Sequence, residues 1–412
     1  MPEENIISEY TLPNGIKILH KYRHGAISHL SLMVGTGMRD ELSNENGLAH
    51  FIEHLLFKGT KRRKAFHILS SLENVGGELN AYTTKEETCI HASFLKEYYN
   101  KAIDLISDIA FNSTYPANEL EKEKEVIIDE INSYRDSPAE EIFDEFENNL
   151  YRGHEMGRNI LGTVDLVNSY SRNDIIRFLR NNYSTDKMVI ATIGDLPFNK
   201  FKNKIISHFS DFQKKTTVSH RTTFSKLPVF NKIEERNNHL SHCIVGGLAY
   251  HIDSAKKMQM VLLNNILGGP GMNSRLNLNI REKYGFAYTI ESQYNAYSDT
   301  GNYSIYMGVD PQSLDKAIDL VFKELNKLKN NKLGSIQLSN AQNQLVGQLA
   351  LSCESGLGEL LSMTRAAFTK EGIEPLSETV KKIRNLKSDD ILDVANEIFS
   401  DDNINLMIYK GL

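Results

Sequence analysis

The positions of the hydrophobic residues predict a similar succession of strands and helices in the two halves of the chain. Apolar residues with helical spacing predict a long helix over 47–58 and another over 256–267. Short runs rich in β-branched and aromatic residues precede each helix and predict pairs of strands. These runs are Ile16–His20 and His29–Val34 in the first half, and Phe230–Glu234 and His239–Leu248 in the second.

Each half also ends with a helix followed by a strand. A helix that begins at Ser171 precedes the strand Met188–Asp195, and one that begins at Ser388 precedes Ile404–Tyr409. Serine is a favoured residue at the start of a helix. The shared order predicts a diverged internal repeat, with two related α+β domains whose antiparallel-rich sheets carry helices on one face.

The length of the chain supports this division. At 412 residues the chain is too long for one ordinary hydrophobic core, so two domains of about 200 residues are expected. We place the domains at 1–213 and 226–412. A polar linker is expected at 214–225, after a helix predicted over 198–212.

The predicted helix 47–58 contains the run His50-Phe51-Ile52-Glu53-His54. On a helix, residues four apart project from one face, and this spacing allows two imidazoles to hold one zinc ion. Glu53 lies on the same edge, where a carboxylate can accept a proton from a metal-bound water and pass it to a leaving amine. The order is the inverse of the commoner His-Glu-x-x-His zinc motif.

A structural role for these residues is the alternative. The chain has 13 histidines, so a pattern of three residues also arises by chance, and a single buried histidine usually serves packing. Here, however, three ionisable groups share an otherwise apolar helix. Burying them without partners would be costly, and metal binding supplies a partner.

Glu130, 76 positions after His54, supplies a third ligand from another predicted helix. Three protein ligands, His50, His54 and Glu130, leave a fourth position open, which is typical of a catalytic zinc. We expect one Zn²⁺ per chain. Glu123 lies two helical turns before Glu130 and faces the same way, so it can orient a ligand from outside the metal shell. A solvated charge on an acidic helix is the alternative for Glu123.

The segments 47–60 and 76–83 and the position of Glu130 resemble the pitrilysin/insulinase family of inverted zinc metallopeptidases. The resemblance is to its short bacterial members and to the catalytic subunit of the mitochondrial processing peptidase, and it covers essentially the whole chain. It implies zinc on the two histidines and the distant glutamate, with Glu53 as the base. It also implies an α+β fold of two homologous α/β sandwich-like domains, each a mainly antiparallel sheet covered by helices, as in LuxS/processing-peptidase-like proteins.

The second half has no such metal motif, because its equivalent helix carries apolar residues instead. In similar peptidases an arginine and a tyrosine seven residues apart reach the active site from this domain, and Arg281 and Tyr288 match that pattern. The Tyr288 hydroxyl can donate to the oxyanion that develops at the scissile carbonyl, and Arg281 can hold the same oxyanion or a substrate carbonyl. An ordinary surface arginine and strand tyrosine are the alternative.

Two further segments are candidates for substrate binding. The β-prone run 78–83 follows two glycines, and as an edge strand it would bind an extended peptide through main-chain hydrogen bonds. An ordinary sheet strand is the alternative. An acidic pair on the predicted helix 139–150 can favour Arg or Lys near the cut, although a solvated acidic face explains it too. The candidate substrate-binding residues are Asn80, Ala81, Tyr82, Thr83, Glu140 and Asp144.

Composition excludes several other classes. With 47 basic and 53 acidic side chains the net charge is −6, so no electrostatic footprint for nucleic acid is present. No apolar run is long enough for a membrane span, and the N-terminus lacks the pattern of a signal or transit peptide. The three cysteines are scattered singly, as in a reducing compartment. We therefore expect a cytoplasmic enzyme without membrane or nucleic-acid partners.

The sequence predicts a zinc-dependent endopeptidase that hydrolyses unstructured peptides or polypeptide segments, bound in extended form inside a closed two-domain or dimeric chamber. Since one chain carries both the metal motif and the Arg/Tyr pair, a homodimer would be self-sufficient, and a heterodimer with an inactive homologue is the alternative. Two other function classes compete. One is a non-catalytic scaffold that keeps the fold, and the other is a metal-dependent hydrolase of small amides.

Overall fold

The computed structural model describes residues 6–217 and 221–412. Contacts within the chain divide it into two compact units. The first unit comprises Met1–Asn132, Arg158–Thr222 and Ser352–Ile373. The second unit comprises Ser133–Gly157, Thr223–Leu351 and Glu374–Leu412. None of the described helices combines the length and apolar character that a bilayer span requires.

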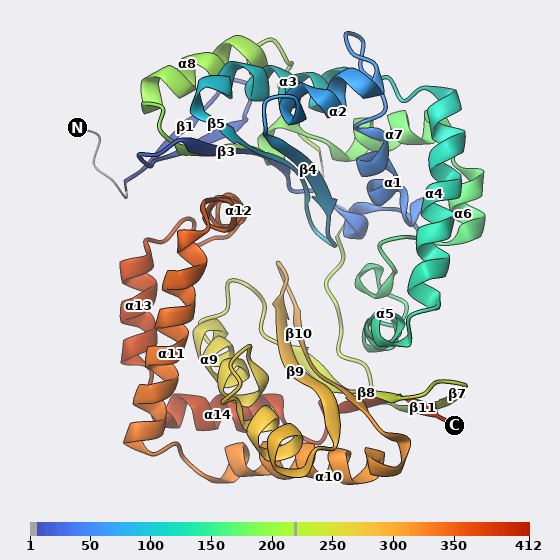
Figure 1. Cartoon of the computed structure of the whole chain (residues 1–412), viewed down its shortest axis with the longest axis vertical. Helices are drawn as coiled ribbons and strands as arrows, with labels where there is room; N and C mark the ends of the chain where they lie inside the picture. The colour runs from blue at the N-terminus through green and yellow to red at the C-terminus, as the bar shows by residue number, and fades with distance from the viewer. Residues whose placement is uncertain (1–5, 218–220) are drawn as a thin grey trace. The chain divides into compact units, whose positions relative to one another are not determined.

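The first unit is built on a six-stranded sheet with the order β1-β2-β6-β3-β5-β4. Its strands are β1 (Ile7–Thr11), β2 (Lys17–Tyr22), β3 (Ile27–Val34), β4 (Glu78–Thr83), β5 (Thr88–Leu95) and β6 (Met188–Gly194). Neighbouring strands are antiparallel except β2 and β6, which run parallel. The strand β4 lies at one edge of the sheet (Figure 1).

The second unit repeats this arrangement in a five-stranded sheet with the order β7-β11-β8-β10-β9. Its strands are β7 (Asn231–Arg236), β8 (Ser241–Ala249), β9 (Ala287–Ala296), β10 (Gly301–Val309) and β11 (Asn405–Gly411). Again one pair, β7 and β11, is parallel and the others are antiparallel. The order matches β2-β6-β3-β5-β4 strand for strand. The predicted α+β fold of two related sheet-and-helix halves is therefore confirmed.

Alternating residues of the first sheet face two different layers. The helices of this unit from the first half of the sequence are α1 (Leu48–Leu55), α2 (Ala65–Glu73), α3 (Tyr99–Asn112), α4 (Ala117–Arg135, as far as Asn132), α6 (Val164–Ser169), α7 (Arg172–Asn182) and α8 (Phe198–Phe209). The helices α3 and α8 cover one face, where Ile103 and Phe201 join Leu32 and Ile190 in the core (Figure 1). This layer agrees with the expectation of helices on one face.

The other face of the first sheet carries a helix from late in the sequence, α12 (Gly356–Ala366). Leu360 and Met363 of α12 pack with Leu19, Val189 and Ile193 of the sheet. The helix contacts β6 and β3. The sequence analysis did not predict this second layer, because the apolar face of an amphipathic helix does not reveal which sheet it covers.

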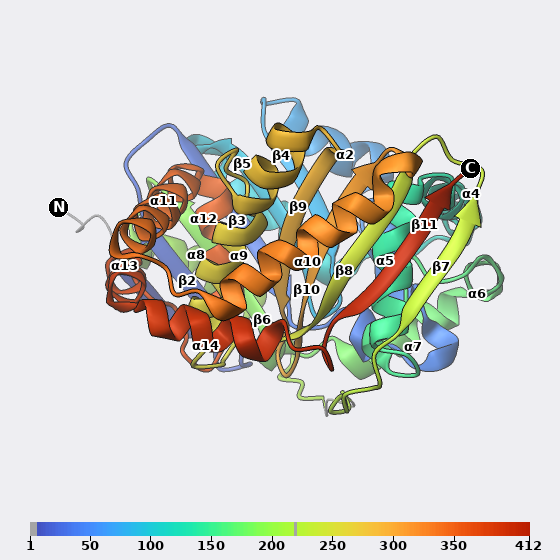
Figure 2. The ribbon, with the colours of Figure 1, turned by 90° about the horizontal axis from the view of Figure 1, so that it is seen from below.

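The second unit shows the reciprocal arrangement. Its helices are α5 (Pro138–Leu150), α9 (Lys257–Gly268), α10 (Leu314–Asn330), α11 (Ser335–Glu354, as far as Leu351), α13 (Leu376–Asn385) and α14 (Ser388–Ile398). The helices α9, α10 and α14 pack on one face of the sheet (Figure 2). On the other face, Ile142 and Phe146 of α5 pack against Ile244, Tyr306 and Tyr409.

The helices α5 and α12 hold equivalent places in the repeat. Each is the third α-helix after the hairpin of its half, which is β4–β5 in the first half and β9–β10 in the second. Each packs on the sheet built mainly from the other half of the sequence. Between Thr222 and Thr223 the chain passes from one unit to the other, inside the predicted linker 214–225. Residues 218–220 of that linker lie outside the described residues. The predicted domain boundaries, 1–213 and 226–412, describe the two halves of the sequence rather than the two units, and they stay a prediction.

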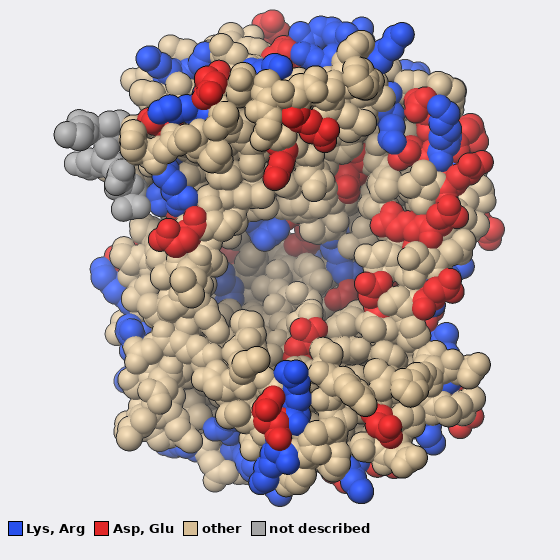
Figure 3. Space-filling view, viewed as in Figure 1, with Lys and Arg blue, Asp and Glu red and all other residues tan. Residues whose placement is uncertain are grey.

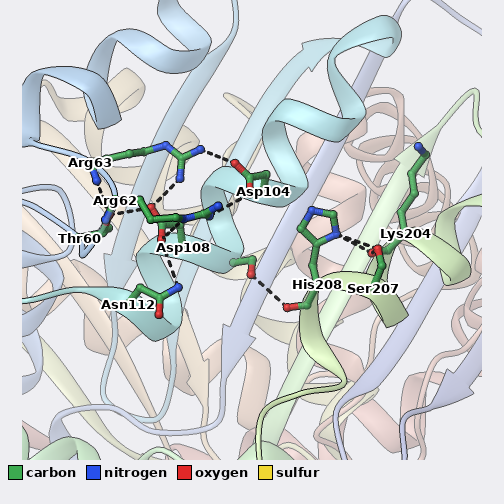
Figure 4. A network of polar contacts seen from close by, with 10 residues as sticks. Thr60, Arg62, Arg63, Asp104, Asp108, Asn112, Lys204, Ser207 and His208 are labelled. Carbon is green, nitrogen blue, oxygen red and sulfur yellow. Dashed lines mark hydrogen bonds and ion pairs between the residues drawn. The ribbon is translucent and has the colours of Figure 1, made fainter.

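A buried polar network fixes the loop that follows α1 (Figure 4). The carboxylate of Asp108 on α3 is fully buried and accepts hydrogen bonds from Thr60 Oγ1 at 2.7 Å, Arg63 Nη1 at 2.6 Å and Arg62 Nε at 3.0 Å. Burial alone would raise the pKa of Asp108, but these three donors outweigh it and lower the pKa. Asp104, one turn earlier, binds both arginines from a more exposed position.

We predict that Asp108→Asn destabilises the first unit by about 2–4 kcal/mol at pH 7, because it removes one partner from a buried charged network. The effect should depend on pH. Since the folded pKa of Asp108 lies below the unfolded value of about 3.9, its contribution is complete above that value and is lost as pH falls through the folded pKa. Urea denaturation at pH 7 and pH 3 measures this, with Asp104→Asn as the control. A difference from wild type that grows on acidification would contradict it.

Candidate metal centre

The start of α1 is held by the carboxyl group of a glutamate in the preceding loop. Glu41 is buried and accepts hydrogen bonds from the backbone amides of Gly47 at 2.9 Å and Ala49 at 2.8 Å. These amides have no partner within the helix, so the two hydrogen bonds satisfy them. Burial raises the pKa of Glu41 to about 8, although the hydrogen bonds from these amides oppose the shift. Gly47 has a φ of +95°, and a Cβ at this position would lie 2.6 Å from the carbonyl oxygen of Leu161. The sequence analysis missed Glu41, because its role depends on the path of the loop.

Apolar packing places α1 against α4. Phe51, Ile52 and Leu55 of α1 share a buried cluster with Ile127 and Ile131 of α4. Acidic side chains gather over the outer surface of α4 (Figure 3), where Glu121, Glu125 and Asp129 are exposed. Glu123 is buried and Glu130 is half-buried. The seven-residue spacing therefore turns these two carboxylates away from the exposed acidic face.

The predicted metal ligands lie together between the two helices. Nε2 of His50 lies 3.8 Å and Nε2 of His54 lies 3.5 Å from Oε2 of Glu130. One ligand atom from each residue lies within 4.8 Å of the others, and no other group of this kind occurs in residues 6–217 and 221–412. Two ligands of a tetrahedral zinc with bonds of about 2.0–2.1 Å are about 3.4 Å apart. The two distances to Glu130 are thus within about 0.4 Å of the separation in a tetrahedral zinc site.

The charges in this group also suit a cation. Burial and the neighbouring His54 lower the pKa of His50, so its ring is neutral, the form that binds metal. Burial opposes charge on His54, but the carboxylates of Glu123 and Glu130 outweigh it and raise its pKa to about 9. Contact with His54 lowers the pKa of Glu130. This group of side chains therefore favours positive charge between the carboxylates of Glu123 and Glu130, and a bound divalent cation would supply that charge.

Glu123 lies behind His54, on the side away from Glu130. Its Oε2 is 3.2 Å from His54 Nδ1, and its Oε1 forms an ion pair with Lys58 Nζ at 2.7 Å. A hydrogen bond from Nδ1–H to this carboxylate leaves Nε2 free to bind a metal. Lys58 was missed in the sequence, although it lies four residues after His54.

Glu53 lies on α1 beside the end of β4. Burial raises the pKa of its carboxyl, and this effect exceeds the opposing influence of Thr83 and His54. A carboxylate with a raised pKa is a better proton acceptor, and it can release the proton again near neutral pH. The predicted base is thus half-buried next to the metal ligands rather than solvated on the surface.

The segment Asn80–Thr83 forms the greater part of the edge strand β4. The strand pairs with β5 in the register Tyr82 to Cys89, and no described strand pairs with its other side. Contacts between α1 and β4 place this edge next to the metal ligands. Asn80 is exposed, Ala81 is buried, and Tyr82 and Thr83 are half-buried.

Four other predicted residues belong to the second unit. Arg281 lies in a π-helical turn, Asn277–Glu282, and is exposed. Tyr288 is near the start of β9 and is 66% exposed. Glu140 is exposed and Asp144 half-buried on α5. The unit that holds the metal ligands includes none of the four, and their roles stay predictions.

We predict that Glu123→Gln weakens zinc binding by about 10- to 100-fold, because the neutral amide holds the His54 ring less firmly. Competition with a chelator of known affinity measures the change. Glu125→Gln is the matched control, since it removes an exposed carboxylate from the same helix. Equal affinities for the Glu123 and Glu125 variants would show that Glu123 plays no part in metal binding.

Comparisons with known proteins agree with this geometry. Residues 17–164 match the family described as Insulinase (Peptidase family M16), and residues 169–345 match the Peptidase M16 inactive domain. The zinc protease YmxG of Bacillus subtilis is 30% identical over 96% of this chain and 97% of its own length. A zinc protease of Streptomyces coelicolor is 30% identical over 94% of this chain and 86% of its own.

A solved structure of a protease from Helicobacter pylori shares the fold, with a TM-score of 0.91 at 20% identity over 98% of this chain and all of that one. A peptidase M16 inactive domain structure from Pseudomonas fluorescens also has a TM-score of 0.91, at 18% identity over 98% of each chain. The matched domains and the full-length relatives together show that the chain belongs to the M16, or insulinase, family of peptidases.

Proposed function

We propose that the chain is a zinc metalloendopeptidase with one Zn²⁺ per chain, held by His50, His54 and Glu130. The observation that carries the proposal is the convergence of these three ligands beside Glu53 and an unpaired sheet edge. Neither a scaffold nor a structural metal site would need a carboxylate with a raised pKa next to the ligands.

Each residue around the proposed zinc has its own role in the reaction. When bound, zinc polarises the scissile carbonyl and acidifies the attacking water. Glu53 accepts the proton of that water and returns it to the leaving amine. Its raised pKa suits both transfers, since a weaker acid is a stronger base. Glu123 and Lys58 keep the His54 ring in position throughout.

We propose that substrates bind to β4 in extended form. Alternate residues of an edge strand direct their N–H and C=O groups away from the sheet, and a peptide can pair with them as one more strand. Asn80, Ala81, Tyr82 and Thr83 would then border the substrate. Because Thr83 adjoins Glu53, a peptide on this edge brings a carbonyl toward the base. Such binding selects unstructured chains and depends little on their sequence.

Finer parts of the proposal rest on the family resemblance. By this resemblance, Tyr288 donates to the oxyanion and Arg281 holds a substrate carbonyl once the second unit closes on the substrate. The substrate is enclosed in a chamber, within one chain or a homodimer, with a heterodimer with an inactive homologue as the alternative. The enzyme is proposed to act in the cytoplasm.

The proposal predicts that the zinc-loaded protein cleaves a pool of unstructured peptides and that Glu53→Gln does not, although it still binds zinc. The amide cannot accept the proton, so kcat should fall by at least about 100-fold. Mass spectrometry of the products, with Glu125→Gln as an active control, measures this. Zinc-loaded wild type that cuts no peptide, or a Glu53→Gln variant as active as wild type, would contradict the proposal.

A second prediction concerns Glu140 and Asp144, which are proposed to favour Arg or Lys near the cut. The variant Glu140→Gln with Asp144→Asn should lower kcat/KM for Arg-containing peptides about 3- to 10-fold relative to neutral ones, because two negative charges are lost. Competition between paired peptides measures the ratio. An unchanged ratio would assign the two residues to an ordinary solvated helix face.

A further inference from the structure

The C-terminal end of α12 touches the same strand that is proposed to bind substrate. Arg365, in the last turn of α12, donates to Glu87 Oε1 from Nε at 2.7 Å and from Nη2 at 2.6 Å. Its Nη2 also lies 3.3 Å from the hydroxyl of Tyr82. All three residues belong to the first unit, although Arg365 lies 278 positions after Glu87.

The three side chains form a closed set of polar contacts. The Tyr82 hydroxyl donates to Glu87 Oε1 at 3.3 Å, so arginine and tyrosine meet at one carboxylate oxygen. The Glu87 side chain is only 10% exposed, which strengthens its ion pair with Arg365. Burial opposes charge on Arg365, but Glu87 outweighs it and raises the pKa of the guanidinium. The arginine is therefore charged and held in one place.

The rest of α12 is anchored independently of β4. Leu360 and Met363 pack on the centre of the sheet. At the other end of the helix, Glu359 binds Lys21 and Arg23 at the end of β2. Arg365 thus belongs to a helix that is fixed to β2 and β6, and its contacts link this helix to β4.

The contacts of Arg365 lie at the end of β4 that adjoins the turn to β5. The strand pairs with β5 on one side only, and Tyr82 is its penultimate residue. The next residue, Thr83, adjoins Glu53. A strand that adds a peptide to its free edge binds more tightly when it is already held in the extended form, since less conformational entropy is lost on binding.

We propose that Arg365 is a positioning residue for substrate: it holds the Tyr82 end of β4 in place, so that the strand can pair with an extended peptide beside Glu53. The inference rests on the proposed function and adds a residue to it. It assigns to the exchanged helix α12 a part in substrate affinity, separate from metal binding and from proton transfer.

The test compares Arg365→Gln, Arg365→Lys and Glu359→Gln in the zinc-loaded full chain. For an unstructured peptide, Arg365→Gln should raise KM about ten-fold and change kcat less than about two-fold, since the base and the metal ligands are untouched. Arg365→Lys keeps the charge and should recover part of the affinity. Glu359→Gln breaks the ion pairs at the other end of α12 but keeps the packing of Leu360 and Met363 that fixes the helix, so it should leave KM within about two-fold of wild type.

A direct binding measurement separates this inference from the proposed function. Fluorescence anisotropy with the same labelled peptide gives Kd for Glu53→Gln and for Glu53→Gln with Arg365→Gln, at a temperature where both are folded and zinc-loaded. The inference expects about ten-fold weaker binding by the double variant. Equal Kd values, or equal effects of Arg365→Gln and Glu359→Gln, would overturn it. Peptide binding without cleavage by wild type would refute the peptidase and leave the Arg365 comparison readable, whereas no binding at all would overturn both.

Discussion

The apolar contact between α1 and α4 is the constraint on which the metal centre depends. Phe51, Ile52 and Leu55 share one buried cluster with Ile127 and Ile131, and this shared core holds the two helices together. His50 and His54 then face Glu130 across a gap of 3.5–3.8 Å. Glu41 fixes where α1 begins, and Asp108 fixes the loop after it. The helix α1 is thus held at both ends before any metal binds.

The exchange of α5 and α12 links the two halves of the repeat to each other's sheets. Each sheet has its second face covered by a helix that the other half supplies. In the first unit this brings Arg365 to the strand beside Glu53. The second half of the sequence therefore contributes a helix to the unit that holds the candidate metal ligands.

Local periodicity was enough to predict the related halves of the fold and to select the candidate ligands that the structure brings together. The His50–His54 spacing, the seven residues between Glu123 and Glu130, and the repeated order of strands are all visible in the sequence, because each depends on residues close along the chain. Glu41 and Arg365 could not be predicted in the same way. Their partners are fixed by the path of a loop and by the sheet on which α12 packs, neither of which leaves a periodic signal. Lys58 lies within reach of local reasoning, since it follows His54 by four residues.

The central claim is that His50, His54 and Glu130 form one zinc centre. Anomalous X-ray diffraction at the zinc absorption edge, from crystals of the chain loaded with one equivalent of zinc, tests it most directly. The account predicts a single peak in each chain, within about 2.0–2.2 Å of Nε2 of both histidines and a carboxylate oxygen of Glu130. A peak at other residues, or none between α1 and α4, would contradict it.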